Sequence, residues 1–146
     1  TNCKQIGETE IIDLLPEKYR HLNAIGRLDK DSEGLIVLTG DGTLATQFLN
    51  TDTPHERIYE VVTAYPVTAI QLTTLANGVD IGNYITKPCH ITQMASRRIQ
   101  LTLIEGKNRQ IRRMIRSIGN RVHRLKRISF GKYTLGDLLP GAYRSI

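Results

Sequence analysis

The residues best suited to chemistry are three carboxylates in a short glycine-bounded segment, Gly26 to Leu35 (GRLDKDSEGL). Asp29, Asp31 and Glu33 occupy alternate positions within it. A carboxylate can act as a nucleophile or as a general base when its surroundings hold it ionised and partly shielded from water. Asp29 follows an apolar residue, which favours that environment. The same side chain could equally cap a turn or pair with Arg27, and the residues alone leave both roles open.

The spacing of these carboxylates also resembles part of a calcium loop. Asp29, Asp31 and Glu33 match its first, third and fifth positions, and Gly34 matches the sixth. The twelfth position is Gly40, where such a loop needs a bidentate glutamate, so we reject calcium. Metal-ligand spacing is also missing from the cysteines and histidines, which are Cys3, Cys89, His21, His55, His90 and His123. We therefore expect no metal site.

A second group with chemical potential is a predicted helix from Arg109 to Ile118. At about 100° per residue, one stripe holds Arg109, Arg112, Arg113 and Arg116. The opposite side holds Ile111, Met114, Ile115 and Ile118. Neighbouring like charges on a helix repel by a few tenths of a kcal/mol per pair, so this stripe makes sense opposite anions. Arginine also binds phosphate through a bidentate fork. Asn108 is expected to cap the helix, whose positive end favours an anion nearby.

The positive charge of the chain is concentrated around this helix. The net charge is +6, and the segment from Arg97 to Lys132 contains twelve lysines and arginines but one acid, Glu105. Such clustering indicates a surface for a polyanion. A DNA-binding helix is one alternative, but the arginine stripe has no Asn or Gln to recognise adenine. The basic surface supports RNA or DNA as the partner and does not choose between them.

The composition indicates one globular domain. The chain has 146 residues, 40% of them hydrophobic, and its longest apolar runs are far too short to span a membrane. Two cysteines cannot form a disulfide framework, so we expect free thiols in a reducing compartment, the cytoplasm. The first residue is Thr1 and no leader follows, which suggests a domain excised from a longer chain. We assume a monomer.

The elements that must position these residues alternate irregularly between helix and strand. Helical patterns are expected at residues 10–15, 43–49, 68–76 and 109–118. Strand patterns are expected at residues 35–39, 57–65, around 91, 99–104 and 122–128, with a last short strand near the end. In the segment 99–104 apolar and polar residues alternate strictly, as in a strand with one buried face. The order lacks a regular βαβ rhythm, which favours an α+β fold.

Three motifs in order closely resemble the RsuA-type family of ribosomal RNA pseudouridine synthases. They are Gly26 to Leu35 (GRLDKDSEGL), Arg57 to Val61 (RIYEV) and Glu105 to Met114 (EGKNRQIRRM). The ending from Arg127 to Arg144, with its LPGAYR stretch, is also similar to that family. The resemblance covers nearly all of the chain from Leu14 onward. It implies the pseudouridine synthase fold, a mixed and largely antiparallel sheet with flanking helices and a central active-site cleft.

By position in the motifs, the resemblance implies a catalytic site of three residues. The family's catalytic aspartate falls on Asp29, its active-site tyrosine on Tyr59 and its basic partner on Arg112, which would contact Asp29 and keep it ionised and oriented. Leu125 would form an apolar wall of the uracil pocket. Substrate contacts are further expected from Arg27, Arg109, Arg113 and Arg116.

The implied activity is the isomerisation of a chosen uridine to pseudouridine in RNA, with ribosomal RNA as the expected substrate. No cofactor is expected, because the reaction needs no redox change and no group donor. The target base must leave its stack to be reached. The family's small RNA-binding domain, which normally precedes the catalytic domain, has no counterpart in this sequence. A non-catalytic RNA-binding module with the same basic helix remains the alternative.

Overall fold

The computed structural model describes residues 11–50 and 54–146. The chain begins with two 3₁₀ turns, at Ile11–Leu14 and Glu17–Tyr19. The strands and α-helices then follow in this order along the chain: β1 Asn23–Ile25, β2 Glu33–Gly34, β3 Val37–Thr39, α1 Gly42–Leu49, β4 Arg57–Thr63, α2 Ala69–Asn77, β5 His90–Ala95, β6 Arg98–Leu103, α3 Gln110–Ser117, β7 Val122–Phe130 and β8 Tyr133–Thr134. The predicted α+β class is confirmed. No helix within these described ranges is long and apolar enough to cross a bilayer.

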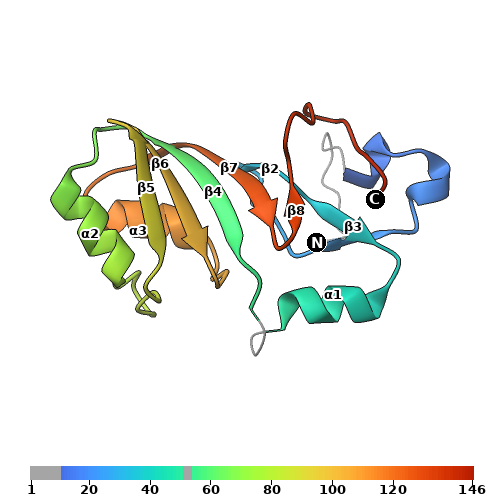
Figure 1. The fold of residues 1–146 in the computed structure, drawn as a ribbon, viewed down its shortest axis with the longest axis horizontal. Coiled ribbons are helices and arrows are strands. Elements are labelled where there is room, and N and C mark those ends of the chain that lie inside the picture. The colour runs from blue at the N-terminus through green and yellow to red at the C-terminus, as the bar shows by residue number, and fades with distance from the viewer. Residues whose placement is uncertain (1–10, 51–53) are drawn as a thin grey trace.

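The main sheet places β4 and β7 side by side at its centre (Figure 1). Its order is β2-β7-β4-β6-β5, with β8 added to β7, and only the β2–β7 pair is parallel. Strand β6 buries Ile99, Leu101 and Leu103 and leaves the residues between them more exposed, as the alternation in the sequence predicts. Cross-strand pairing then aligns Tyr59 of β4 with Leu101 of β6 and Arg127 of β7.

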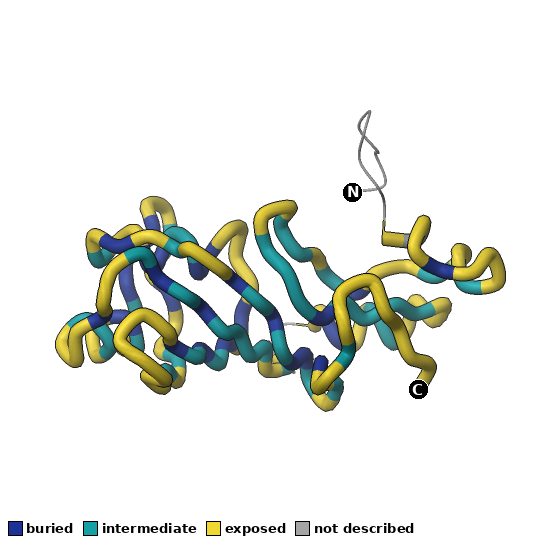
Figure 2. The backbone as a smooth tube through the Cα atoms, turned by 90° about the horizontal axis from the view of Figure 1, so that it is seen from above, coloured by how far each residue is buried: buried dark blue, intermediate teal, exposed yellow. Residues whose placement is uncertain are grey.

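Two hydrophobic cores stabilise the molecule at either end of β7. The larger lies between the sheet and helices α2 and α3, and includes Val61, Leu75, Leu101, Met114 and Ile115. The smaller packs α1 and β1 against the end of β7, around Ile25, Leu35, Phe48, Phe130 and Leu135. Buried positions accordingly follow the strands in Figure 2, while most connecting segments are exposed. The segment with the three carboxylates begins and ends at the smaller core, because Ile25 and Leu35 flank it.

Gly34 allows this carboxylate segment to lie directly against β7. Its φ is +117°, and a Cβ at this position would lie 2.2 Å from the carbonyl oxygen of Arg127. The amide of Leu35 donates a hydrogen bond to that same oxygen at 2.8 Å. Because only glycine fits both the backbone angle and the contact, this residue fixes where the segment meets the sheet.

Several predicted boundaries differ from the structure. The segment expected to form a helix at residues 10–15 is a 3₁₀ turn over its described part, and the loop at 26–34 ends in the two-residue strand β2. The short strand β1 was not predicted. Thr68 caps α2, because its hydroxyl accepts a hydrogen bond from the Gln71 amide. Cys3 lies outside the described residues.

The predicted cap of the arginine helix is wrong. The N-cap of α3 is Arg109, not Asn108, and no side chain caps it. Arg109 has left-handed backbone angles, φ 49° and ψ 36°, which are uncommon for a residue other than glycine. Just before the helix, the backbone amide of Lys107 instead donates a hydrogen bond to the side-chain oxygen of Gln110 at 3.0 Å. This start of the helix directs Arg109 toward the carboxylate segment.

Candidate active site

A cleft of about 400 Å³ lies where the carboxylate segment, the sheet and the start of α3 meet. Asp29 and Arg27 line it from the carboxylate segment, and Tyr59 and Leu125 line it from β4 and β7. Apolar side chains form much of the remaining wall: Leu28, Leu103, Ile111 and Phe130. A concave pocket that combines apolar walls with convergent polar groups is the usual form of a ligand-binding site.

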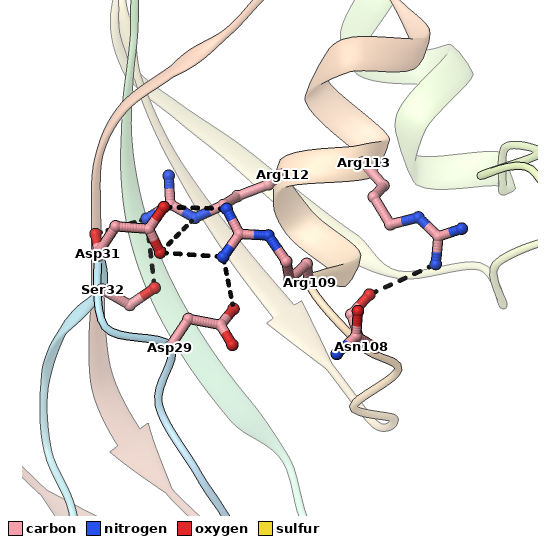
Figure 3. A network of polar contacts seen from close by, with 7 residues as sticks. All are labelled: Asp29, Asp31, Ser32, Asn108, Arg109, Arg112 and Arg113. Carbon is pink, nitrogen blue, oxygen red and sulfur yellow. Dashed lines mark hydrogen bonds and ion pairs between the residues drawn. The ribbon is translucent and has the colours of Figure 1, made fainter. Parts of the chain in front are cut away.

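Asp29 lies at this cleft and pairs with Arg109 from the start of α3 (Figure 3). Its Oδ2 is 3.7 Å from Nη1 of Arg109, and its side chain is 31% exposed. The carboxylate is therefore partly shielded and remains accessible to a ligand.

Asp31 is held more tightly by the same arginine. Nη1 and Nη2 of Arg109 donate to its two carboxylate oxygens at 3.1 and 2.9 Å, a bidentate fork. These hydrogen bonds lower the pKa of Asp31 below its ordinary value, and the charge of Arg112 acts in the same direction. Arg109 thus joins the two aspartates of the segment.

Arg112 contacts the carboxylate segment, but not at Asp29. Its Nη2 donates to the backbone oxygen of Asp31 at 2.6 Å and to Oγ of Ser32 at 3.3 Å. Its Nε lies 3.4 Å from Oδ1 of Asp31. The expected contact between Arg112 and Asp29 is therefore not formed among the described residues, and Arg109 takes that place. The left-handed N-cap puts Arg109 nearest to Asp29, while Arg112, about one turn further along α3, reaches the turn after it (Figure 3).

The predicted substrate contacts divide between two surfaces. Arg27 and Leu125 line the cleft, as does Arg109. Arg113 and Arg116 do not. They belong to a groove of about 320 Å³ between α3 and the start of β7, whose lining is Asn108, Arg109, Arg112, Arg113, Arg116, Asn120, Arg121 and Val122. Arg113 donates to the side-chain oxygen of Asn83 at 3.1 Å, whereas Arg116 is exposed.

Two cleft residues were missed in the sequence. Arg57 and Arg127 both line the cleft, and their guanidinium carbons lie 4.9 and 4.8 Å from the centre of the Phe130 ring. Arg127 was counted with the surface charges, yet it is only 2% exposed. The strand period of two could have placed it, because Leu125, a predicted cleft residue, is two positions away on the same face of β7.

Glu105 is a third missed residue, and it holds the segment before α3. It accepts hydrogen bonds from the Tyr84 hydroxyl at 2.5 Å, the Lys87 amide at 2.8 Å and the Gln110 amide group at 3.0 Å. Burial acts to raise the pKa of Glu105, but these hydrogen bonds outweigh it and lower the pKa below its ordinary value. Glu105 therefore stabilises this part of the cleft wall through its three hydrogen bonds.

Comparisons with known proteins show which family the chain resembles. A family model described as RNA pseudouridylate synthase matches residues 4–117. Dual-specificity RNA pseudouridine synthase RluF of Escherichia coli (strain K12) is 38% identical over 141 residues, which cover 96% of this chain and 48% of the relative. Ribosomal large subunit pseudouridine synthase E of Vibrio vulnificus (strain CMCP6) is 35% identical over 158 residues, covering 96% and 67%.

The structural comparison leads to the same family. A solved structure described as a crystal structure of pseudouridylate synthase has a TM-score of 0.87 at 30% identity, covering 92% of this chain and 60% of that one. The chain spans about half the length of the RluF relative that it matches. The family resemblance predicted from the three motifs is confirmed: this chain belongs to the RNA pseudouridylate synthase family.

Proposed function

We propose that this chain isomerises a uridine to pseudouridine in RNA, with ribosomal RNA as substrate. The observation that carries the proposal is the meeting of Asp29, Tyr59 and Leu125 at one cleft, in a chain of this family. Relatives named as RNA and ribosomal large subunit pseudouridine synthases support the substrate class. We also propose that the chain works in the cytoplasm, where ribosomal RNA is available.

The proposed reaction rearranges bonds within one nucleotide. The bond from ribose C1′ to uracil N1 breaks, the ring turns within the cleft, and C1′ bonds to ring carbon C5. The proton on C5 leaves and N1 gains one, so the product is an isomer of the substrate. Asp29 acts either as a nucleophile at C1′ or as a base on the ribose. Both roles require an ionised carboxylate with access to the ligand.

The residues around Asp29 have distinct proposed roles. Arg109, and not Arg112, is the charge that positions Asp29, because Arg109 is its ion-pair partner. Arg112 orients the segment by binding the backbone of Asp31. Tyr59 and Leu125 contact the two sides of the uracil ring, and Tyr59 can assist the proton transfer from C5. Arg27 contacts the nucleotide from the same segment as Asp29.

The groove beside the cleft, here called the arginine groove, binds the phosphates of the flanking RNA. Its arginines are Arg109, Arg112, Arg113, Arg116 and Arg121. Flipping a base from a stacked helix costs a few kcal/mol. Phosphate contacts by Arg109, Arg113 and Arg116 offset this cost, and they act without regard to sequence. The groove adjoins the cleft through Arg109 and Asn108, which line both. An RNA strand bound along α3 therefore passes the entrance of the cleft.

The proposal is tested by mapping pseudouridines. Ribosomal RNA from cells lacking the full protein is compared, position by position, with RNA from cells that have it. We expect at least one position to lose its pseudouridine and to regain it when the purified protein is added to the unmodified RNA. Binding of that RNA without any isomerisation would instead support the non-catalytic module and overturn the proposal.

A further inference from the structure

Arg127 carries a buried positive charge that the fold satisfies only in part. Its side chain is the largest of those that are fully buried among the described residues. Nε donates to the backbone oxygen of Leu35 at 2.9 Å, but Nη2 is buried without a hydrogen-bond partner. No carboxylate in the described parts of the chain forms an ion pair with it. A buried charged donor without an acceptor is costly, so its retention in a cleft suggests that a ligand supplies the acceptor.

The surroundings make this end of the cleft electropositive. Arg57 lies over the same Phe130 ring, 4.9 Å from its centre, and Arg127 lies 4.8 Å from it. Burial lowers the pKa of Arg127, Tyr59 raises it, in part through a side-chain hydrogen bond, and the charge of Arg57 lowers it further. Both carboxylates that line the cleft are engaged elsewhere, Asp29 with Arg109 and Glu105 with its three donors.

The position of Arg127 relates this charge to the base and not to the RNA backbone. Arg127 is the cross-strand partner of Tyr59, and Leu125 lies two residues before it on the same strand. Tyr59 and Leu125 are the residues proposed above to hold the uracil ring. Backbone phosphates have their own surface in the arginine groove, of which Arg127 is not a part. The ligand atom expected at Arg127 is therefore a carbonyl oxygen of the base.

Resting on the proposed function, we infer that Arg127 is a catalytic residue that donates a hydrogen bond to a uracil carbonyl oxygen and stabilises the charge of the detached ring. When the C1′–N1 bond breaks, its electron pair stays with the ring, whose negative charge spreads over the ring nitrogens and carbonyl oxygens. The charge disappears when C5 supplies the pair for the new bond to C1′ and its proton is replaced by one on N1. A fixed donor in a shielded site stabilises such a transient charge more than it stabilises the neutral base.

The test compares Arg127→Met and Arg127→Lys with the wild type in the full chain, using RNA shown to be a substrate. Single-turnover rate, RNA affinity and thermal unfolding are measured for each. We expect Arg127→Met to lower the rate by about 10²- to 10³-fold, the usual effect of losing one such donor, with RNA affinity changed less than about threefold. The rate of Arg127→Lys should lie between those of the wild type and Arg127→Met, because a single nitrogen cannot donate to both Leu35 and the base.

A matched control is Arg20→Met. Nε of Arg20 also donates to a backbone oxygen, that of Leu15 at 3.3 Å, but Arg20 is exposed and does not line the cleft. Its rate and affinity should equal those of the wild type. Arg127→Lys keeps the charge and most of the packing, so it provides the result if Arg127→Met does not fold.

A second substrate separates a catalytic role from a structural one. Fluorine at C5 withdraws electrons and stabilises the detached ring by itself. The loss of base–sugar cleavage caused by either Arg127 variant should thus be several-fold smaller on RNA with 5-fluorouridine at the target position. Equal losses on both substrates, or a rate within about threefold of the wild type, overturn the inference while the proposed function stands. A wild-type chain that forms no pseudouridine overturns both.

Discussion

At the scale of single residues, the site depends on which arginine meets Asp29. The motif order assigns that part to Arg112, whereas the structure places Arg109 there and gives Arg112 to the turn after it. Arg109 also binds Asp31 through two hydrogen bonds. One guanidinium therefore positions two carboxylates, and Asp31 limits where that guanidinium can move. The division of roles between the two arginines can be tested directly.

Replacing Arg109 by Ala should reduce the rate of isomerisation by about 10- to 100-fold, because Asp29 loses the charge that holds it in place. Arg109→Lys should recover part of this loss, since lysine keeps the charge but not the fork. Arg112→Ala should reduce the rate of isomerisation less than Arg109→Ala does, because it leaves the ion pair between Asp29 and Arg109 intact. Rates are measured at saturating RNA. A greater loss in Arg112→Ala than in Arg109→Ala would contradict this assignment and return Arg112 to the role that the motifs predict.

At the scale of elements, the cleft depends on two supports outside the reacting residues. Gly34 lets the carboxylate segment touch β7, and Glu105 holds the segment before α3 by three hydrogen bonds. Neither residue is expected to touch the nucleotide. Their substitution should therefore change stability first, and rate only through the shape of the cleft.

Gly34→Ala should lower the free energy of unfolding by about 2–4 kcal/mol. The added Cβ meets the backbone of Arg127, and the positive φ is strained for alanine. Gly42→Ala is the matched control, because a Cβ there meets nothing within 4 Å and the residue begins α1. That control should be neutral or slightly stabilising. Denaturant unfolding measures both, and equal stability of the two variants would show that the close contact at Gly34 is not needed.

Glu105 should make the stability of the folded protein depend on pH. Its pKa is lowered in the folded protein, so its charged form adds stability above its unfolded value of about 4.5. That contribution should disappear as the pH falls through the lower folded value. The wild type should thus exceed Glu105→Gln in melting temperature near pH 7, and the gap should narrow below about pH 4.5. A constant gap from pH 7 to pH 3 would show that the ionised carboxylate is not what stabilises this segment.

The sequence predicted the long elements and also the short strand β3, but it missed β1 and β2, for physical reasons. Strand β6 and helix α3 have enough residues to display their periods, and both were found. Strands β1 and β2 have three and two residues, too few to show alternation, and they form only through tertiary pairing. The left-handed angles of Arg109 have no signal in the sequence, because arginine rarely adopts them. That one backbone conformation accounts for the wrong partner assigned to Asp29.

At the scale of the whole molecule, positive charge is concentrated on the surface that we propose binds RNA. The groove beside the cleft is lined by five arginines and no carboxylate. Arg109 and Arg112 are bound to Asp31, and Arg113 is bound to Asn83, whereas Arg116 and Arg121 form no ion pair among the described residues. The sequence predicted this surface from clustering alone, but not which arginines remain available.

Arg116→Ala should reduce the slope of log affinity against log salt concentration by about 0.7–0.9, the value for one lost phosphate contact. Arg113→Ala should change the slope less than was expected from the helix alone, because Arg113 is hydrogen-bonded within the protein. Lys18→Ala, which removes an equal charge from an exposed residue that lines neither the cleft nor the groove, serves as the control. RNA affinity is measured over a range of salt concentrations. An unchanged slope in Arg116→Ala would show that this face of α3 does not contact RNA.

The central claim is that the carboxylate of Asp29 performs the chemistry and is not needed for binding. The most direct measurement compares pseudouridine formation and RNA affinity for Asp29→Asn, with Asp137→Asn, an exposed carboxylate in the loop after β8, as the control. The account predicts no detectable pseudouridine in Asp29→Asn, RNA affinity within about threefold of the wild type, and full activity in the control. Normal product formation by Asp29→Asn would contradict the account.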